Sequence, residues 1–434
     1  MKAVKCKAFF RGVHPHDMKY LSNKCETEVM PAPKVVAISC SQSLGKPAVP
    51  VVEIGQDVSI GEVIARQDGA ISSDVFASVC GKVTDIKDLV GASGATEKFI
   101  FIENDGRDDK KYFEPMKDED LTPQAIKQRI RDCGIVGLGG AGFPVAIKIS
   151  PKSPVDTLIV NGAECEPYLT CDHRLMLEHT DEIVRGARYI ARSLDVTNII
   201  IGIEANKPDA IAAFEPYEDI QPVILKKRYP MGGEKQLIYV CTGRKVGLGK
   251  LPADSGVVVQ NVATCFASCE AIEQGKPHVE RIVTVTGKAV MQPKNLWVRI
   301  GTSIKEIVDY CGGEKVKPLK VVQGGPMTGI ALSTYDVYTH KTTSGILLMS
   351  PEEAKRDDPT PCLNCGKCAE VCPMHLLPMN TAFYATAGDY EAAAKYGNTL
   401  SCIECGACDY ICPARRPLIQ SIRATKAAMR GKKK

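Results

Sequence analysis

Two groups of four cysteines near the end of the chain have a spacing that suits metal clusters. The groups are Cys362, Cys365, Cys368 and Cys372, and then Cys402, Cys405, Cys408 and Cys412. Each reads C-x2-C-x2-C-x3-C and is followed by a proline. Three closely spaced thiolates can bind three irons of one 4Fe–4S cube, and the fourth, set back before the proline, binds the other cube. The pattern predicts two one-electron carriers that lie close together.

The fourth cysteines are therefore expected to cross between the groups. We expect one cluster on Cys362, Cys365, Cys368 and Cys412, and the other on Cys402, Cys405, Cys408 and Cys372. Two structural zinc sites are the alternative, but identical spacing with a terminal Cys-Pro in both groups favours iron–sulfur clusters. A helix is predicted at 380–397, between the groups, which is typical of a ferredoxin-type helical module. The other eleven of the 19 cysteines lack regular spacing, and we interpret most as reduced thiols.

A glycine-rich stretch, GLGGAGFPVAIK at 137–148, has a glycine spacing that suits the binding of a nucleotide cofactor. Its glycines at 137, 139 and 142 have the G-x-G-x-x-G spacing of Rossmann folds, in which the glycines follow a strand and open a helix. Here they follow a predicted helix over 122–133, and Phe143-Pro144 comes directly after them. This context disfavours a Rossmann site, which stays an alternative together with a flexible surface loop. The stretch predicts a loop whose backbone lies close to a cofactor.

Three later motifs accompany the glycine loop: NGAECEP at 161–167, GGEKQL at 232–237 and QNVAT at 260–264. In order and spacing the four resemble the flavin-bearing subunit of respiratory complex I, whose motifs are G-R-G-G-A-G-F-P-T-G-L-K, N-A-D-E-S-E-P, G-E-E-T-A-L and N-N-V-E-T. The resemblance implies FMN and NAD(H) as cofactors. The chain departs from it at Leu138, Ala163 and Tyr168, where the family has Arg, Asp and Gly. These departures concern detailed contacts with the flavin and the nucleotide.

The resemblance also assigns roles to single residues. Phe143 would stack on the nicotinamide and Lys148 would neutralise phosphate charge. Glu164 and Glu166 would bind the NAD hydroxyls or the adenine side, and the helix start at 232–234 would receive the FMN phosphate. The expected cofactor-binding residues are Gly137, Gly139, Gly140, Gly142, Phe143, Lys148, Asn161, Glu164, Glu166, Gly232, Gly233, Glu234, Gln260, Asn261 and Thr264. No side chain is expected to be catalytic, because hydride transfer is the chemistry of the flavin itself.

Hydrophobic periodicity divides the chain into units, which together predict a multidomain α/β and α+β fold. Short β segments up to 106 resemble a lipoyl/biotinyl-type barrel sandwich, and the hairpin AISSDV lacks the usual attachment lysine, so we expect a structural or docking module. The other units are an α/β domain for FMN and NADH at 121–275, a β-grasp-like (SLBB-type) unit at 281–350, the two-cluster ferredoxin module at 358–417, and a basic tail at 418–434.

Composition and hydropathy indicate which partners and which cellular location to expect. The 434 residues are 44% hydrophobic with a net charge of +4, which does not suggest a nucleic-acid binder. No apolar run approaches the roughly 18–20 residues needed to span a bilayer, and the N-terminal residues lack an apolar signal core. We therefore expect the chain to stay in the cytoplasm, with any membrane contact peripheral. The tail can form a helix with Leu418, Ile419, Ile422 and Met429 near one side, which could lie on an anionic membrane or against a partner subunit; a solvated end is the alternative.

The order of the units, together with GVHPHDMKYLSNK and VNGAECEPYLTCDHRLMLEH, resembles the RnfC family of the Rnf ion-translocating ferredoxin:NAD⁺ oxidoreductase complexes. It implies a peripheral protein on the cytoplasmic face of the cell membrane that exchanges hydride between NAD(H) and FMN and passes single electrons through two 4Fe–4S clusters. Its partners would be the ferredoxin-type, flavin and membrane subunits of a complex that translocates Na⁺ or H⁺ elsewhere. The alternatives are a cobalamin reductase of propanediol-utilising microcompartments, against which the leading β module counts, and an electron-wiring adaptor without flavin.

Overall fold

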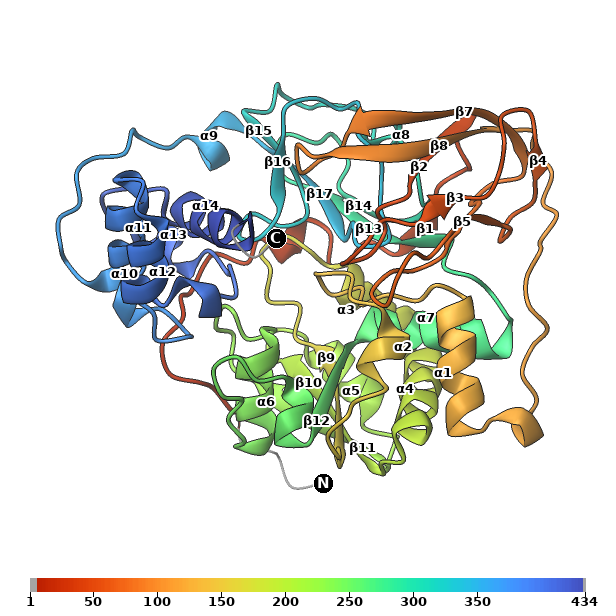
Figure 1. The fold of residues 1–434 in the computed structure, drawn as a ribbon, viewed down its shortest axis with the longest axis horizontal. Helices are drawn as coiled ribbons and strands as arrows, with labels where there is room; N and C mark the ends of the chain where they lie inside the picture. The colour runs from red at the N-terminus through yellow and green to blue at the C-terminus, as the bar shows by residue number, and fades with distance from the viewer. Residues whose placement is uncertain (1–5, 432–434) are drawn as a thin grey trace.

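The structure is a computed structural model that describes residues 6–431. Four units lie around a common centre (Figure 1). The N-terminal β unit lies at the upper right, the α/β domain below it, a second sheet at the top centre, and the helical cysteine-rich module at the left. Short 3₁₀ helices are found at Lys19–Leu21, Asp118–Asp120, Pro252–Ser255 and Thr399–Ser401.

The N-terminal β unit is a sandwich of two antiparallel sheets. One sheet has the order β2-β8-β7-β4 and the other β3-β5-β6. Apolar side chains from both sheets, such as Val36, Ile64 and Ile100, fill the space between them. The strands are β2 (Val35–Ser39), β3 (Val49–Pro50), β4 (Asp57–Val58), β5 (Val63–Arg66), β6 (Val75–Phe76), β7 (Gly81–Val90) and β8 (Thr96–Asn104).

The hairpin at which related modules carry a lysine is buried between units of this chain. Ser73 and Asp74 are 5% and 7% exposed. Lys341, itself buried, donates to the carbonyl oxygens of Asp74 and Gly134, each at 2.8 Å. The hairpin thus joins the sandwich to the α/β domain, so it is not free to move as an arm.

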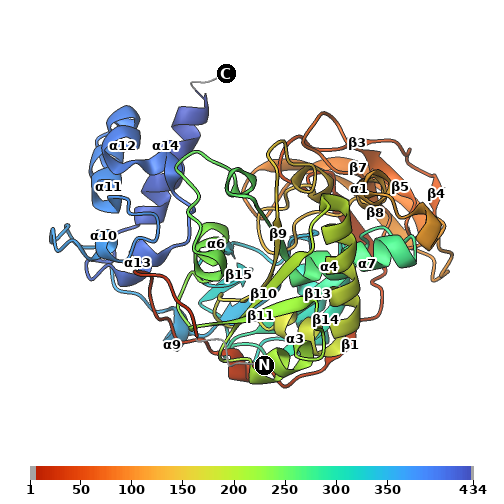
Figure 2. The same ribbon diagram turned by 90° about the horizontal axis from the view of Figure 1, so that it is seen from below.

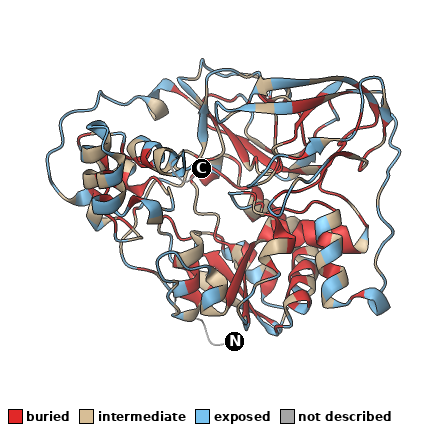
Figure 3. Ribbon diagram, in the orientation of Figure 1, coloured by how far each residue is buried: buried red, intermediate tan, exposed pale blue. Residues whose placement is uncertain are grey.

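The α/β domain has a parallel sheet with the order β11-β10-β9-β12. Its strands are apolar on both faces because helices cover both: α4 and α7 pack on one face and α6 on the other (Figure 2; buried strands red in Figure 3). The elements are α1 (Pro123–Asp132), α2 (Val145–Lys148), β9 (Thr157–Gly162), α3 (Cys171–Glu178), α4 (Thr180–Leu194), β10 (Asn198–Glu204), α5 (Pro208–Phe214), β11 (Ile220–Leu225), α6 (Glu234–Thr242), β12 (Val257–Asn261) and α7 (Val262–Glu273).

Strand β9 is first in the chain but lies between β10 and β12. The chain therefore leaves β9 in one direction and later returns to its other side. Ligands of open parallel sheets bind beside such a reversal, at the carboxyl ends of the strands, and this edge of the sheet is called the crevice below. The ends of β9 and β12 are in register, with Asn161 opposite Asn261.

The second large sheet has six strands in the order β1-β14-β13-β17-β15-β16. Helix α8 covers it with Ile304, Ile307 and Val308. Strand β1, from the N-terminal segment, pairs with β14 and not with the sandwich that follows it in sequence. The elements are β1 (Thr27–Val29), β13 (Glu280–Thr286), β14 (Lys294–Arg299), α8 (Ile304–Tyr310), β15 (Lys320–Gln323), β16 (Ile330–Leu332), β17 (Gly345–Met349) and α9 (Pro351–Ala354).

The cysteine-rich module is helical, with α10 (Lys367–Glu370), α11 (Pro378–Thr386), α12 (Tyr390–Gly397), α13 (Ala407–Ile411) and α14 (Leu418–Gly431). The single helix predicted at 380–397 is divided at Gly388, whose φ of 79° ends α11. The tail expected from 418 is, through Gly431, helix α14, which buries Leu418, Ile419 and Ile422 in the module. Its last residues, 432–434, lie outside the described part.

The segment before β1 runs past three of the units (Figure 1, red). The backbone N–H of Lys7 donates to Ile224 beside the parallel sheet, and that of Gly12 donates to Val371 of the cysteine-rich module. Strand β1 then joins the six-stranded sheet. The N-terminal segment together with β1, residues 6–29, is called the strap below.

Candidate functional site

Two cavities in the helical module are lined by the eight regularly spaced cysteines. One, of about 400 Å³, is lined by Cys372, Cys402, Cys405 and Cys408. The other, of about 390 Å³, is lined by Cys362, Cys365, Cys368 and Cys412. The fourth cysteine of each group thus lies with the first three of the other group. The structure brings together the two sets that the sequence predicts, and their role as cluster ligands stays a prediction.

The two cysteine loops have the same local conformation. Left-handed backbone occurs at Asn364 and Gly366 in the first loop, and forty positions later at Glu404 and Gly406 in the second. In both loops the glycine precedes a short helix that carries the third cysteine. The tight turns are therefore repeated along with the cysteine spacing.

Burial favours the protonated form of several of these thiols. Burial raises the pKa of Cys405 to about 12 and also raises the pKa of Cys402 and Cys368. Iron binds thiolates, so cluster binding would release these protons. Within residues 6–431 no three His, Cys, Asp or Glu side chains are grouped as ligands of a single metal ion, whereas a cube is held by thiolates that bind separate irons.

The two cavities differ in their access to solvent. Cys362 and Cys365 are exposed, whereas Cys372 and Cys408 are buried. The cavity at Cys405 faces the α/β domain, because the Tyr229 hydroxyl donates to the carbonyl oxygen of Cys405 at 2.7 Å. We call this the inner cavity and that at Cys362 the outer cavity.

Four sequence motifs meet at the carboxyl ends of β9 and β12. Asn161 Nδ2 donates to the carbonyl oxygen of Gly232 at 3.0 Å, and Asn261 Nδ2 lies 3.5 Å from the carbonyl oxygen of Asn161. A Cβ on Gly139 would lie 2.9 Å from Asn261 Cβ, so the loop can approach only as glycine. The structure therefore brings together Gly139, Asn161, Gly232 and Asn261.

The glycine loop is a packed turn and not a Rossmann element. Gly137 N–H donates to the carbonyl oxygen of Phe143 at 2.9 Å, and Leu138 N–H donates to the Thr264 hydroxyl at 3.0 Å. The loop precedes β9 and opens α2, a helix of four residues. Both alternatives, a Rossmann site and a flexible surface loop, are therefore wrong. The tip at Gly139 and Gly140 is exposed.

Charged groups lie beside this edge at the start of α6. Lys148 Nζ is 2.6 Å from Glu234 Oε1, and Gly233 is the N-cap of α6. The first N–H groups of a helix and a lysine are groups that bind phosphate. The structure thus also brings together the residues expected at the FMN phosphate.

The residues present fit a flavin mononucleotide. Gln260 is 2% exposed, and its Nε2 has no hydrogen-bond partner in the described part of the chain. A Cβ on Gly140 would meet nothing within 4 Å, which leaves room over the loop. An unpaired buried donor, an open glycine loop and a helix N-terminus suit the polar groups of such a ligand.

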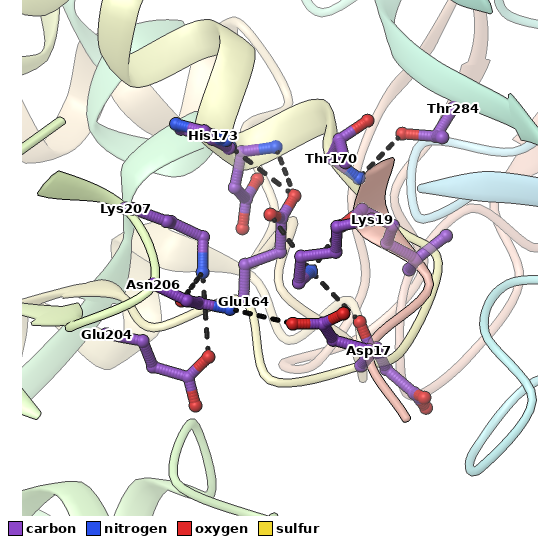
Figure 4. Close-up of polar contacts among 12 residues, drawn as sticks. Asp17, Lys19, Glu164, Thr170, His173, Glu204, Asn206, Lys207 and Thr284 are labelled. Atoms are coloured by element: carbon purple, nitrogen blue, oxygen red, sulfur yellow. Dashed lines mark hydrogen bonds and ion pairs between the residues drawn. The ribbon is translucent and has the colours of Figure 1, made fainter. Parts of the chain in front are cut away.

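Glu164 and Glu166, expected at the nucleotide, have partners within the chain. Glu164 accepts from Asp172 N–H at 2.7 Å and lies 3.3 Å from Lys19 Nζ of the strap (Figure 4). Glu166 accepts from the backbone N–H of Thr328 at 2.7 Å. Burial raises the pKa of Glu166. Their part in binding NAD stays a prediction.

Sequence reasoning missed the other members of this buried cluster. Lys207 Nζ lies 3.5 Å from Glu204 and donates to the carbonyl oxygen of Ala163 at 2.8 Å (Figure 4). Burial acts to lower the pKa of Lys19, but Glu164 and Glu204 outweigh it and raise that pKa. No local motif marks these residues, because they meet from distant parts of the chain.

Comparison with known families accounts for each unit. Residues 7–107 match the RnfC barrel sandwich hybrid domain, 130–269 the Nuo51 FMN-binding domain, 282–331 the SLBB domain and 354–413 the 4Fe-4S dicluster domain. The corresponding subunit of the proton-translocating ferredoxin:NAD(+) oxidoreductase complex of Clostridium ljungdahlii is 44% identical over 98% of this chain and 94% of the relative. The chain belongs to the RnfC family.

Other members of the RnfC family are similar over a comparable length. The counterpart in the Na(+)-translocating ferredoxin:NAD(+) oxidoreductase complex of Acetobacterium woodii is 41% identical over 98% of this chain and 97% of the relative. The counterpart in the ion-translocating oxidoreductase complex of Rhodobacter capsulatus is 40% identical over 96% of this chain and 82% of the relative.

Several expectations are thereby confirmed: the multidomain fold class, the resemblance to the RnfC family, a role as one subunit of a ferredoxin:NAD⁺ oxidoreductase complex, and domains for FMN and for two 4Fe–4S clusters. Among residues 6–431, no helix has both the length and the apolar character needed to cross a membrane.

Proposed function

We propose that this chain exchanges hydride between NAD(H) and an FMN at the carboxyl ends of β9 and β12, and relays single electrons through two 4Fe–4S clusters. When bound, FMN supplies the conversion between the two-electron chemistry of NAD(H) and one-electron steps. The chain would work at the cytoplasmic face of the membrane, against ferredoxin-type, flavin and membrane subunits. Translocation of Na⁺ or H⁺ would take place elsewhere in that complex.

The residues around the crevice would bind and orient the flavin. Asn161 and Asn261 present side-chain amides at the strand ends, and the loop at Gly139 and Gly140 lets backbone approach the ligand. Lys148 and the N-terminus of α6 would hold the phosphate. For Glu164 or Glu166 to reach a dinucleotide, their contacts with Lys19 or Thr328 would have to open.

The observation that carries the proposal is one loop that touches both sites. Between β11 and α6, Gly232 accepts from Asn161 in the crevice, while Tyr229 donates to the carbonyl oxygen of Cys405 at the inner cavity. Cys165 lies between them, because its Sγ accepts from Gly232 N–H at 3.2 Å and it packs with Tyr229. A flavin in the crevice would therefore have protein contacts leading directly to the inner cluster.

The same geometry supports an order of electron carriers. The inner cluster would exchange electrons with the flavin, and the outer cluster with another subunit through the exposed side at Cys362 and Cys365. The shared fourth cysteines keep the two cavities adjacent. The order applies in either direction of electron flow.

Anaerobic reduction of the reconstituted chain by NADH tests this function. We expect FMN to bind and both flavin and cluster absorbance to bleach. Replacing both Asn161 and Asn261 with Ala should abolish the flavin signal and spare the clusters. A chain that holds two clusters but binds no FMN, or whose FMN is not reduced by NADH, would be an electron-wiring adaptor and would refute the proposal.

A single-residue variant tests the contact between the sites. Tyr229→Phe removes the hydroxyl that reaches Cys405, and Tyr239→Phe is the control on the exposed side of α6. We expect Tyr229→Phe to keep its FMN and its NADH-driven flavin reduction, and to shift the potential or slow the reduction of one cluster only. If both variants behave as the wild type, the loop is not the link between flavin and cluster.

A further inference from the structure

A third cavity, of about 320 Å³ including its opening to solvent, lies between the α/β domain and the six-stranded sheet. Its walls come from α3, α7, β13 and β14, together with Leu138 of the glycine loop. Many of its lining side chains are ionisable, and none of the eight regularly spaced cysteines is among them. These ionisable residues are Cys171, Asp172, Glu270, His278, Glu280 and Arg281.

Asp172 joins this cavity to the flavin crevice. Its Oδ2 accepts from Asn261 Nδ2 at 2.7 Å, and Asn261 lies against Gly139 and Asn161. Asp172 is half-buried at the wall of this cavity. One hydrogen bond therefore separates a carboxyl group on the cavity wall from the proposed flavin position.

One residue of the cavity wall has an unpaired polar group. His278 is 6% exposed, and its Nε2 has no hydrogen-bond partner within residues 6–431. Burial lowers the pKa of His278 well below its usual range, so this ring is neutral. The unpaired ring nitrogen and the carboxyl groups of the wall offer the two to four polar partners that an ordered water needs.

Two other carboxylates of the cavity wall belong to a half-buried ion cluster. Glu280 is paired with Lys276 at 2.7 Å and with Arg299 at 3.1 Å, and its side chain is 21% exposed. Lys276 also binds Glu270 at 2.6 Å. The wall of one cavity thus holds Asp172 together with two partly exposed carboxylates.

We propose that Asp172 and this cavity carry protons between solvent and the flavin crevice, an inference that rests on the function proposed above. Hydride transfer from NADH brings two electrons and one proton, and complete two-electron reduction of FMN takes one further proton. That proton would leave the Asp172 carboxyl group, whose O–H bond breaks, and water in the cavity would reprotonate the carboxylate. When two electrons leave singly for the clusters, the same carboxylate would receive the two released protons in turn.

The surroundings of Asp172 suit both steps. Burial, together with the charge of Glu164, raises the pKa of Asp172 to about 6, so protonated and ionised forms both exist near neutral pH. The hydrogen bond from Asn261 and the charges of Arg281 and Lys19 act in the opposite direction. The other ionisable groups on the cavity wall are Cys171, Glu270, His278 and Glu280, and burial keeps the Cys171 thiol neutral by raising its pKa.

Redox-induced infrared difference spectra of the FMN-loaded protein test the inference without NADH. Electrochemical reduction should change a carboxyl C=O band that disappears in Asp172→Asn and persists in Asp195→Asn, a control at the exposed end of α4. Both variants should retain FMN. The same band in Asp172→Asn as in the wild type would overturn the inference, whereas failure of NADH to reduce the flavin would overturn only the proposed function.

Kinetics give the second readout. With NADH, flavin reduction in the wild type should slow as pH rises through about 6, and Asp172→Asn should be at least about tenfold slower with a flat pH profile. If Asp172→Asn does not fold, His278→Leu tests the relay instead. This variant should retain FMN and slow the reduction of the flavin by NADH. A wild-type rate and pH profile in the folded variant would refute the relay.

Discussion

The raised pKa of Asp172 has a consequence for stability that can be measured apart from any cofactor. A native pKa of about 6 against the ordinary value of 3.8 means that folded protein binds this proton more tightly than unfolded protein does. The sign follows from linkage: stability contributed by Asp172 is highest at low pH and is lost as pH rises through the unfolded and then the native pKa. Asp172→Asn, which stays neutral, should therefore gain relative to the wild type as pH rises.

The size of this gain follows from the shift. A difference of about two pKa units corresponds to roughly 3 kcal/mol once both states are ionised, at pH 7.5, and to roughly 1 kcal/mol at pH 4.5. The amide can still accept a hydrogen bond from Asn261, so the contact across the crevice is retained. The free energy of unfolding of Asp172→Asn minus that of the wild type should thus increase by about 2 kcal/mol between these pH values.

The single tryptophan provides the assay. Trp297 lines the same cavity and packs against Phe266, with ring centroids 5.6 Å apart. Urea unfolding followed by its fluorescence reports on this interface, and the Asp195→Asn variant controls for a change in net charge. An equal difference between Asp172→Asn and the wild type at pH 4.5 and pH 7.5 would show that the Asp172 pKa is not raised, and would remove the electrostatic support for the relay.

Three further predictions concern the other sites. Gly139→Ala places a Cβ 2.9 Å from the asparagine at the end of β12 and should lower FMN content at least about tenfold, whereas Gly431→Ala at the end of α14, with nothing within 4 Å of the added Cβ, should not; bound flavin after desalting measures both. Crossed ligation predicts that Cys412→Ser and Cys362→Ser alter the same one of two paramagnetic cluster signals, and different signals would contradict it. Lys19→Ala leaves buried carboxylates without their cation and should cost roughly 3–5 kcal/mol in calorimetry; an unchanged melting temperature would show that the pair is not needed.

Local patterns predicted much of this molecule correctly. The helix expected at 122–133 forms as α1, and its N-terminus is capped as the Thr-Pro start indicates, with Ala125 N–H donating to Thr122 Oγ1 at 3.3 Å. The strand at 157–162 forms because its apolar run suits burial on both faces. Both features depend on residues close together in sequence, where backbone geometry and side-chain periodicity dominate.

Other features were not available from local patterns. A single helix at 380–397 was wrong because Gly388 adopts a left-handed conformation between two helices. The helix predicted in the basic tail, with Leu418, Ile419 and Ile422 near one side, forms as α14, but local patterns did not show that this side packs on the cysteine-rich module. A charged helix with one apolar side predicts burial only when the surface it will cover is known.

The sequence by itself determined which chemical groups the protein offers. The cysteine spacing, the glycine loop and the amides at strand ends are all short motifs that can be recognised without a structure. Tertiary structure alone decided which groups meet, as when Lys19 reaches Glu164 across 145 positions and Asp172 accepts from Asn261 across 89. The physical reason is that a spacing constrains only residues within a turn or two, whereas a buried charge takes whatever partner the packing of distant segments brings to it.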